Sequence, residues 1–205
     1  MNISRSLLKL FGWKVRYEVE EPQKSIICVA PHTSNWDFIL GKLAYWSEKK
    51  EAGFLMKKSW FFFPMGYLLK AMQGVPINRS KRMSVTDQMI QLFKKRERFH
   101  LAITPEGTRS PVSKWKTGFY RIAKGAGVPI QLAYLDFAKK EVGITEVFYP
   151  TGDQEADMKH IYDYYRNVTA KYPEKFLLPE EEAPISYLSP KGKDDTVHGG
   201  ELNED

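Results

Sequence analysis

A histidine and an aspartate stand five positions apart in this chain, at His32 and Asp37, directly after the apolar stretch 26–30. An imidazole can act as a base on an alcohol when one ring nitrogen is free and an anionic partner holds the other. On one uninterrupted helix, five positions would turn the two side chains about 140° apart. A strand ending near His32, a turn over 33–35 and a helix starting near Asp37 would let the carboxylate fold back. The spacing is therefore consistent with a His–Asp dyad.

The same segment has a purely structural interpretation. Ser34 and Asp37 fit the capping-box pattern, in which a serine and an acid three positions later satisfy the first N–H groups of a helix. Asp37 would then be only a helix-start acid, and His32 only a polar residue at a strand end. The segment by itself leaves both interpretations open.

A second candidate segment, residues 103–110, also follows an apolar run. Pro105 and Gly107 indicate a tight turn, and Gly107 can adopt a positive φ that lets backbone N–H groups converge on an oxyanion. Arg109 offers a rigid fork suited to phosphate or carboxylate. The alternative is an ordinary surface turn with a solvated Glu106–Arg109 pair.

A third candidate segment is strongly basic. Between residues 57 and 82 the chain carries six Lys and Arg residues, Arg79 among them, and no acid. Such a stretch attracts anions, although a solvated basic loop is the commoner cause of a charge run. The interleaved aromatic residues 60–63 are unusual for a solvated loop.

Taken together and in this order, the motifs resemble those of a known family. The chain has His-x4-Asp at 32–37, Gly74 to Arg79, Pro-Glu-Gly-Thr-Arg at 105–109, Lys116-Thr-Gly118 and Val-Pro-Ile at 128–130. This set resembles the glycerolipid acyltransferases, that is, the lysophospholipid or 1-acylglycerol-3-phosphate acyltransferases. The resemblance spans roughly residues 24–135.

The resemblance implies a reaction and a set of site residues. His32 would be the general base that takes a proton from the acceptor hydroxyl, and Asp37 would orient it, with no acyl-enzyme required. No cofactor is implied beyond the acyl donor, which is acyl-CoA or acyl carrier protein. The implied substrate-binding residues are Arg79, Glu106, Gly107, Thr108, Arg109 and Lys116.

Composition favours one basic domain with an acidic tail. The 205 residues carry a net charge of +6, but residues 180–205 hold eight acids and two lysines, so residues 1–179 carry +12. A basic body suits anionic lipid head groups or the phosphates of coenzyme A. No nucleic-acid-binding motif is present, so we expect no nucleic-acid partner.

The few cysteine and histidine residues do not indicate a metal site. Cys28 is the one cysteine and lies in an apolar stretch, which predicts a small core residue. His100, His160 and His198 lack the spacing of metal ligands, so we expect surface or capping positions and no metal.

Two segments are candidates for contact with a membrane. The chain has no apolar run near the ~20 residues that a spanning helix needs. Residues 1–20 predict a short basic amphipathic helix, which could be a membrane-surface anchor or could cap the core. Residues 60–63 could contact a membrane or an acyl chain, or be ordinary core. We expect a peripheral protein at the cytoplasmic face of a membrane.

Strand and helix patterns alternate along the chain, which predicts a single α/β domain over residues 1–179. We expect a central, mostly parallel or mixed sheet flanked by helices, with the active site at the carboxyl ends of the strands. Residues 180–205 predict a flexible tail. The predicted strands are 25–30, 54–56, 75–77, 99–103, 130–135 and 147–149, and the predicted helices are 36–48, 81–96, 119–126 and 154–172.

The function predicted from sequence is transfer of a fatty acyl group from a thioester to a hydroxyl of a lysophospholipid such as 1-acylglycerol-3-phosphate. An acyl thioesterase is one alternative, although the chain lacks a Gly-x-Ser-x-Gly nucleophile turn. A non-catalytic phosphate- or lipid-binding module on the same scaffold is the other. Thiol release that requires an acceptor would distinguish the transferase from both.

Overall fold

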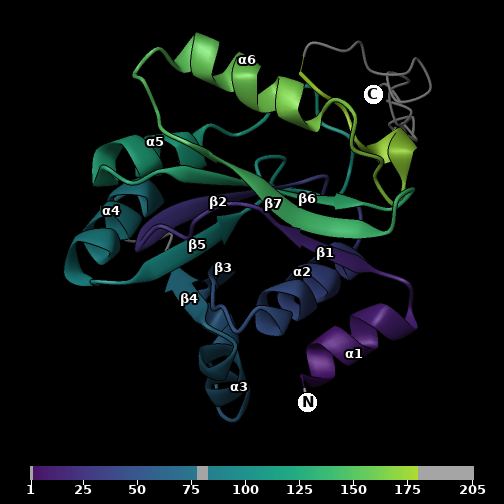
Figure 1. The fold of residues 1–205 in the computed structure, drawn as a ribbon. Helices are drawn as coiled ribbons and strands as arrows, with labels where there is room; N and C mark the ends of the chain where they lie inside the picture. The colour runs from purple at the N-terminus through teal and green to yellow at the C-terminus, as the bar shows by residue number, and fades with distance from the viewer. Residues whose placement is uncertain (1, 78–82, 180–205) are drawn as a thin grey trace, which may run out of the picture.

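A seven-stranded sheet forms the centre of the protein (Figure 1). The computed structural model describes residues 2–77 and 83–179, so Arg79 and the predicted tail over 180–205 lie outside the described residues. The strand order is β1-β7-β6-β2-β5-β3-β4. The strands are β1 (Lys14–Tyr17), β2 (Lys24–Ala30), β3 (Gly53–Lys57), β4 (Gly74–Ile77), β5 (Phe99–Ile103), β6 (Ile130–Asp136) and β7 (Glu141–Phe148).

All strand pairs are parallel except the β6–β7 hairpin, which is antiparallel. The predicted single α/β domain with a mostly parallel sheet is therefore confirmed. β2 lies between β5 and β6 and is nearly continuously apolar, as expected of a strand covered on both faces. Because β2 and β5 are parallel neighbours, the segments that follow them, which begin at Pro31 and Thr104, emerge at the same edge of the sheet.

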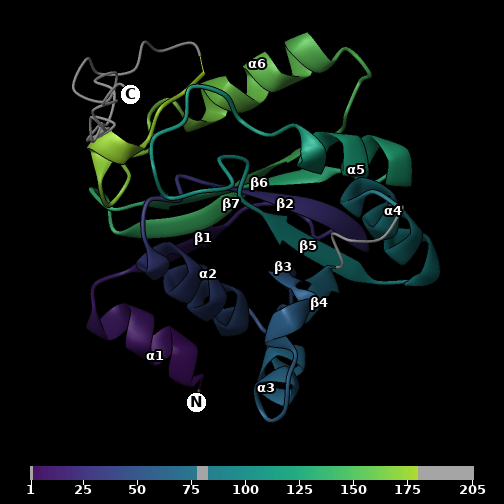
Figure 2. The same ribbon diagram turned by 180° about the vertical axis from the view of Figure 1, so that it is seen from behind.

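Helices cover both faces of the sheet (Figures 1 and 2). α2 packs on one face with α1 outside it, whereas α4, α5 and α6 cover the other face. α3 projects from the end of the molecule near β3 and β4. The α-helices are α1 (Ile3–Leu10), α2 (Asn35–Ser47), α3 (Met65–Ala71), α4 (Val85–Lys95), α5 (Gly118–Ala126) and α6 (Gln154–Tyr165).

The alternation of side chains along β2 divides the core into two layers. Ile26, Cys28 and Ala30 pack toward α4, α5 and α6, and Ile27 packs toward the α2 face. Cys28 is fully buried, which confirms the core position predicted for it. His100 is also buried, and its Nδ1 lies 2.8 Å from Ser25 Oγ, so the predicted surface or capping position is wrong for this histidine.

Five elements differ from the sequence-based expectation. β7 begins at Glu141, whereas the predicted strand covered only residues 147–149. The helix predicted over residues 1–20 is confined to α1, because residues 14–17 form β1 instead. β1 is a four-residue edge strand with alternating exposed and half-buried residues, and its apolar signal is too weak to be recognised. α3 lies within the basic, aromatic stretch and was not predicted. α6 ends at Tyr165 rather than residue 172, because the chain then turns back and Thr169 accepts a hydrogen bond from the Phe137 N–H.

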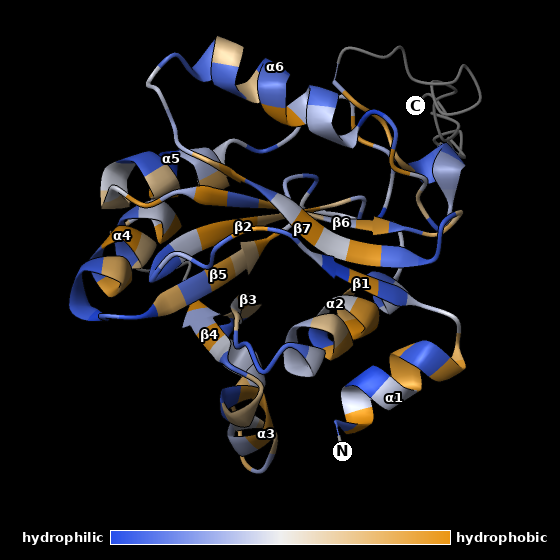
Figure 3. Ribbon diagram, in the orientation of Figure 1, coloured by the Kyte–Doolittle hydropathy of each residue, from blue (hydrophilic) through white to orange (hydrophobic). Residues whose placement is uncertain are grey.

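The aromatic residues that precede α3 are on the surface. Trp60 is 55% exposed, Phe62 is 56% exposed and Phe63 is 82% exposed, so the core interpretation is wrong for these three residues. α1 likewise exposes an apolar stripe formed by Ile3, Leu7 and Leu10. Figure 3 shows apolar residues on both α1 and α3, which extend from the same end of the molecule.

Candidate active site

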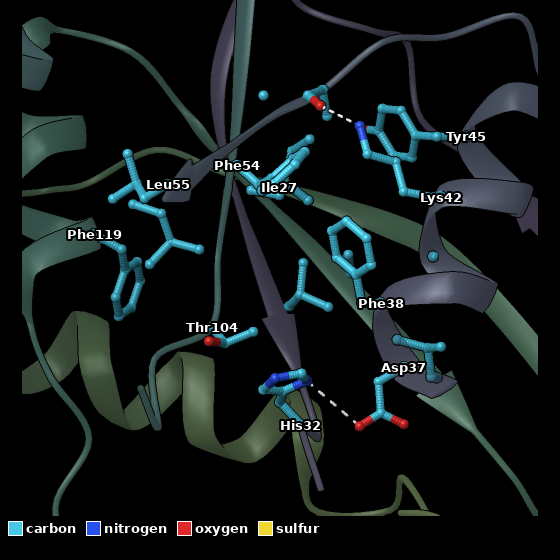
Figure 4. A pocket seen from close by; sticks show the side chains of 18 of the residues that line it. Ile27, His32, Asp37, Phe38, Lys42, Tyr45, Phe54, Leu55, Thr104 and Phe119 are labelled. Carbon is cyan, nitrogen blue, oxygen red and sulfur yellow. Dashed lines mark hydrogen bonds and ion pairs between the residues drawn. The ribbon is translucent and has the colours of Figure 1, made fainter. Parts of the chain in front are cut away.

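His32 and Asp37 come together where β2 ends and α2 begins (Figure 4). The His32 Nδ1 atom lies 3.4 Å from the Asp37 Oδ2 atom, and the Asp37 side chain is almost fully buried. Nδ1 faces the carboxylate, so Nε2 is the ring nitrogen left to exchange a proton with another molecule. The distance is longer than a good hydrogen bond.

Asp37 also closes the turn between the strand and the helix. Its Oδ2 atom accepts hydrogen bonds from the backbone N–H groups of Thr33 and Ser34, both at 2.7 Å, and its Oδ1 atom accepts one from the Ser34 hydroxyl. The capping-box pattern is therefore present together with the dyad geometry. These hydrogen bonds fix the orientation of the Asp37 carboxylate at the start of α2.

Glu106 lies behind His32 rather than on the wall of a cavity. Its side chain is buried, and its Oε1 atom accepts a hydrogen bond of 2.9 Å from the His32 backbone N–H. Burial raises the pKa of Glu106 to about 7, although the hydrogen bond from His32 opposes that shift. In this arrangement Glu106 holds the backbone of His32, a contact that the 74-residue separation hides from sequence reasoning.

The loop after β5 has the tight turn expected from its sequence. Gly107 adopts a φ of 65°, a left-handed conformation that favours glycine, and a Cβ atom at this position would lie 2.7 Å from the flexible end of Lys116. The Lys116 N–H donates a 2.8 Å hydrogen bond to the Pro105 carbonyl oxygen, which fixes the lysine over the turn. The Thr108 hydroxyl accepts from the Ser110 N–H and stays within the loop.

Three cations gather at the mouth of the site. Lys57, Arg109 and Lys116 all line the same cavity as His32. The Arg109 guanidinium donates a hydrogen bond to the amide oxygen of Asn35, which leaves its charge uncompensated. Among residues 2–77 and 83–179, no carboxylate lies within ion-pair distance of any of the three. Sequence reasoning did not assign Lys57 and Asn35 to the site, although Lys57 belongs to the basic stretch and Asn35 stands inside the His-x4-Asp motif.

A cavity of about 1020 Å³ extends from these polar groups into the protein and is lined mostly by apolar side chains. Asp37, Gly41, Ala44 and Tyr45 line it at helical spacing along α2. Its size is at the upper end of the roughly 300–1,000 Å³ usual for small-molecule sites. An apolar space of this kind can hold a hydrocarbon chain.

Lys42 also lines the cavity, and Figure 4 shows it beside Tyr45, away from His32. Its ammonium group donates to the carbonyl oxygens of Ala52 and Met72, at 2.7 and 2.9 Å. Burial lowers the pKa of Lys42 to about 8. These bonds tie α2 to the segment before β3 and to the end of α3, so Lys42 supports the cavity wall.

Comparison with known proteins identifies the family. The family model described as Acyltransferase matches residues 14–134, which is more than half of the chain. The chain belongs to the acyltransferase family. No curated protein sequence is similar enough to this acyltransferase to count as a match.

One solved structure shares the fold of this acyltransferase. It is the 1-acyl-sn-glycerophosphate (LPA) acyltransferase PlsC from Thermotoga maritima, with 18% sequence identity and a TM-score of 0.54. The similarity covers 78% of this chain and 73% of the other chain. The family match contains His32, Asp37 and the turn around Gly107, so the site described above lies within the region that the family model matches.

In the part of the chain that the structure describes, no group of three or more His, Cys, Asp or Glu side chains could hold a metal ion. None of the helices in that part is long and apolar enough to cross a membrane.

Proposed function

We propose that this protein transfers a fatty acyl group from a thioester to a hydroxyl of an anionic lysophospholipid, with lysophosphatidate as the first candidate acceptor. The observation that carries the proposal is the position of His32. Its Nδ1 atom faces the Asp37 carboxylate, and the ring lines an apolar cavity together with Lys57, Arg109 and Lys116. Within the described residues, none of these three cations has a carboxylate at ion-pair distance.

The proposed reaction is a direct transfer. His32 Nε2 takes the proton of the acceptor hydroxyl as that oxygen attacks the thioester carbonyl, and Asp37 stabilises the imidazolium that forms. The C–S bond then breaks, and the imidazolium returns the proton to the leaving thiolate. The products are the ester and a free thiol, and the acceptor alcohol is the nucleophile throughout.

The cations at the mouth support an acceptor with a phosphate group. Arg109 and Lys116 stand on the loop after β5, at the same sheet edge as His32. A planar guanidinium and an ammonium group suit phosphate oxygens. Arg79, the third proposed phosphate ligand, lies outside the described residues. In the proposed site, Gly107 and Thr108 shape the loop and Glu106 holds His32.

The donor is proposed to be acyl-CoA or acyl carrier protein, since both present an acyl chain on a thioester. The apolar cavity next to His32 supports a fatty chain over a short acyl group. Holding an alcohol and a thioester together away from water would supply a large part of the rate.

We also propose that the protein works on a membrane surface as a peripheral protein, at the cytoplasmic face where anionic lipids attract basic segments. Two exposed apolar patches support this. The α1 patch consists of Ile3, Leu7, Leu10 and Phe11 and is accompanied by Arg5 and Lys9. The α3 patch consists of Trp60, Phe62, Phe63, Tyr67 and Leu68 and is accompanied by Lys57, Lys58 and Lys70.

The test is thiol release from palmitoyl-CoA with and without a panel of lysophospholipids, comparing the wild type with His32→Ala. We expect release that requires an acceptor and that falls by about 10²-fold or more in the variant, the lower end of a general-base contribution. Circular dichroism of both proteins controls for folding.

Three other outcomes would contradict the proposal in different ways. Thiol release without any acceptor would indicate a thioesterase. Lipid binding without release, from either palmitoyl-CoA or palmitoyl carrier protein, would indicate a non-catalytic module. Acceptor-dependent release that survives in His32→Ala would remove His32 as the base.

A further inference from the structure

The sheet opens between β3 and β5 close to the proposed active site. The two strands are paired at only two positions, Gly53 with Leu101 and Phe54 with Ala102. Beyond these pairs β3 continues to Lys57 beside β4, and β5 continues to Ile103 beside β2. A gap therefore separates the carboxyl-terminal halves of two neighbouring strands.

The cavity passes through this gap. Ile27 and Ala102 are register partners and face α2, so their sequence neighbours on the strands face the opposite side of the sheet. The cavity is nevertheless lined by two neighbours on β5, Ala102 and Ile103, and by two neighbours on β3, Phe54 and Leu55. Residues of both sheet faces, on both sides of the gap, thus line one continuous space.

The cavity consequently has two lobes that meet beside His32. The α2-side lobe is lined by Ile27, Phe38, Gly41 and Tyr45, and the α5-side lobe is lined by Leu55, Ile77, Gly118, Phe119 and Ile122. Figure 4 shows Leu55 and Phe119 on one side of the view and Phe38, Lys42 and Tyr45 on the other, with His32 and Thr104 between them.

Each lobe has a glycine in its wall with open space for a larger side chain. A Cβ atom added at Gly41 or at Gly118 would meet no atom within 4 Å, and neither glycine has a positive φ. A larger side chain at either position can therefore enter the cavity without backbone strain. The two positions are matched probes, one for each lobe.

We infer that the two lobes hold two hydrocarbon chains at the same time: the donor chain in the α2-side lobe and a chain of the acceptor in the α5-side lobe. This assignment rests on the proposed function. Lys116 lies two residues before Gly118, so an anionic head group bound at Lys116 is next to the α5-side lobe. The donor thioester reaches His32 from the other side, along the lobe that begins at Phe38.

The experiment measures binding, which needs no catalysis. Full-length protein is titrated with S-hexadecyl-coenzyme A, a thioether that cannot transfer its chain, and with palmitoyl lysophosphatidate, each alone and in the presence of the other. The variants are Gly41→Leu and Gly118→Leu, with Gly41→Ala and Gly118→Ala as matched controls. Thermal unfolding checks that each variant is folded.

We expect wild-type protein to bind both ligands together. Gly118→Leu should weaken lysophosphatidate binding about tenfold or more, because its side chain displaces at least two methylene groups, and should change thioether binding less than about twofold. Gly41→Leu should show the reverse pattern. Glycerol 3-phosphate, which has no hydrocarbon chain, should bind equally to the wild type and to Gly118→Leu.

Two results would overturn the inference. If both leucine variants weaken the thioether, one chain runs through the gap and the lobes form a single channel. If neither variant changes lipid binding, the lobes do not hold hydrocarbon. If each leucine variant weakens only its own ligand but the protein transfers no acyl group, the two-chain site stands and the proposed reaction is overturned. Failure of the inference and failure of the proposed function are therefore distinguishable.

Discussion

Glu106 has a buried carboxyl group with a raised pKa, and the same group holds the backbone of the proposed base, His32. Because burial raises its pKa from 4.5 to about 7, the folded protein binds this proton more tightly than the unfolded chain does. The stability that this difference contributes is complete below about pH 4.5 and is lost as pH rises through about 7. The corresponding change in the free energy of unfolding is at most about 3 kcal/mol.

The substitution Glu106→Gln tests whether the raised pKa of Glu106 makes the stability of the protein depend on pH. Glutamine keeps an oxygen that accepts from the His32 N–H but does not titrate. We expect the stability of the variant, relative to wild type, to increase steadily between pH 4.5 and 7.5 in urea unfolding experiments. A difference that is constant over this range would show that Glu106 is not forced to hold a proton. Glu106→Leu, which leaves the His32 N–H without its acceptor, should lose more acyl-transfer activity than Glu106→Gln.

At the scale of single elements, substitution of two glycines by alanine should change the free energy of unfolding in opposite directions, although both glycines have open space beside them. Gly41 lies within α2 at negative φ, whereas Gly127 ends α5 at a φ of 65°. A Cβ atom at either position meets nothing within 4 Å. Any difference between the two substitutions therefore reports backbone conformation rather than packing.

We expect Gly41→Ala to raise the free energy of unfolding by about 0.5–1 kcal/mol, because alanine loses less conformational freedom than glycine in a helix. Gly127→Ala should lower it by about 1 kcal/mol or more, since left-handed backbone is unfavourable for alanine. Denaturant unfolding of both variants measures the two changes. Equal signs would contradict the backbone conformation assigned to one of the two glycines.

At the scale of the whole molecule, α1 and α3 bring the α1 patch and the α3 patch to the same end of the protein (Figures 1 and 2). If both patches enter a bilayer surface, Leu10→Ser combined with Phe63→Ser should weaken binding to vesicles that contain phosphatidylglycerol. We expect a loss of about tenfold or more, since each residue would otherwise bury a large apolar side chain. Vesicle co-sedimentation measures the affinity.

Tyr149→Ser is the matched control, because Tyr149 is 67% exposed but belongs to neither patch. It should bind vesicles like the wild type. Binding should also weaken as salt is raised, because the flanking lysines and arginine contribute through screened attraction. Undiminished binding of the double variant would show that the patches do not form the membrane-facing surface.

The parts of this protein that could be predicted from sequence are those that depend on near neighbours in the chain. The His32–Asp37 turn spans six residues, and its strand end, capping serine and helix start are all encoded there. Gly107, in the loop after β5, indicated a positive φ by its residue type, because glycine adopts this conformation readily. The buried central strands were visible as apolar runs, and their alternation with helices was enough for the fold class.

The remaining features required the tertiary structure, because they depend on segments far apart in sequence. The Glu106 hydrogen bond to His32 and the Arg109 contact with Asn35 each join residues 74 positions apart. Burial is set by the neighbours that the topology supplies, so the raised pKa of Glu106 and the exposure of Phe63 could not be predicted from residue type.

The cavity is the clearest case of a feature that only the three-dimensional structure decides. It exists because β3 leaves β5 after two paired residues, and no local pattern in either strand records where that pairing ends. By itself, therefore, the sequence determined the approach of Asp37 to His32 and the class of fold, since both follow from local backbone and side-chain preferences. The tertiary structure decided the two-lobed space beside the dyad, because packing between distant strands and helices sets its walls.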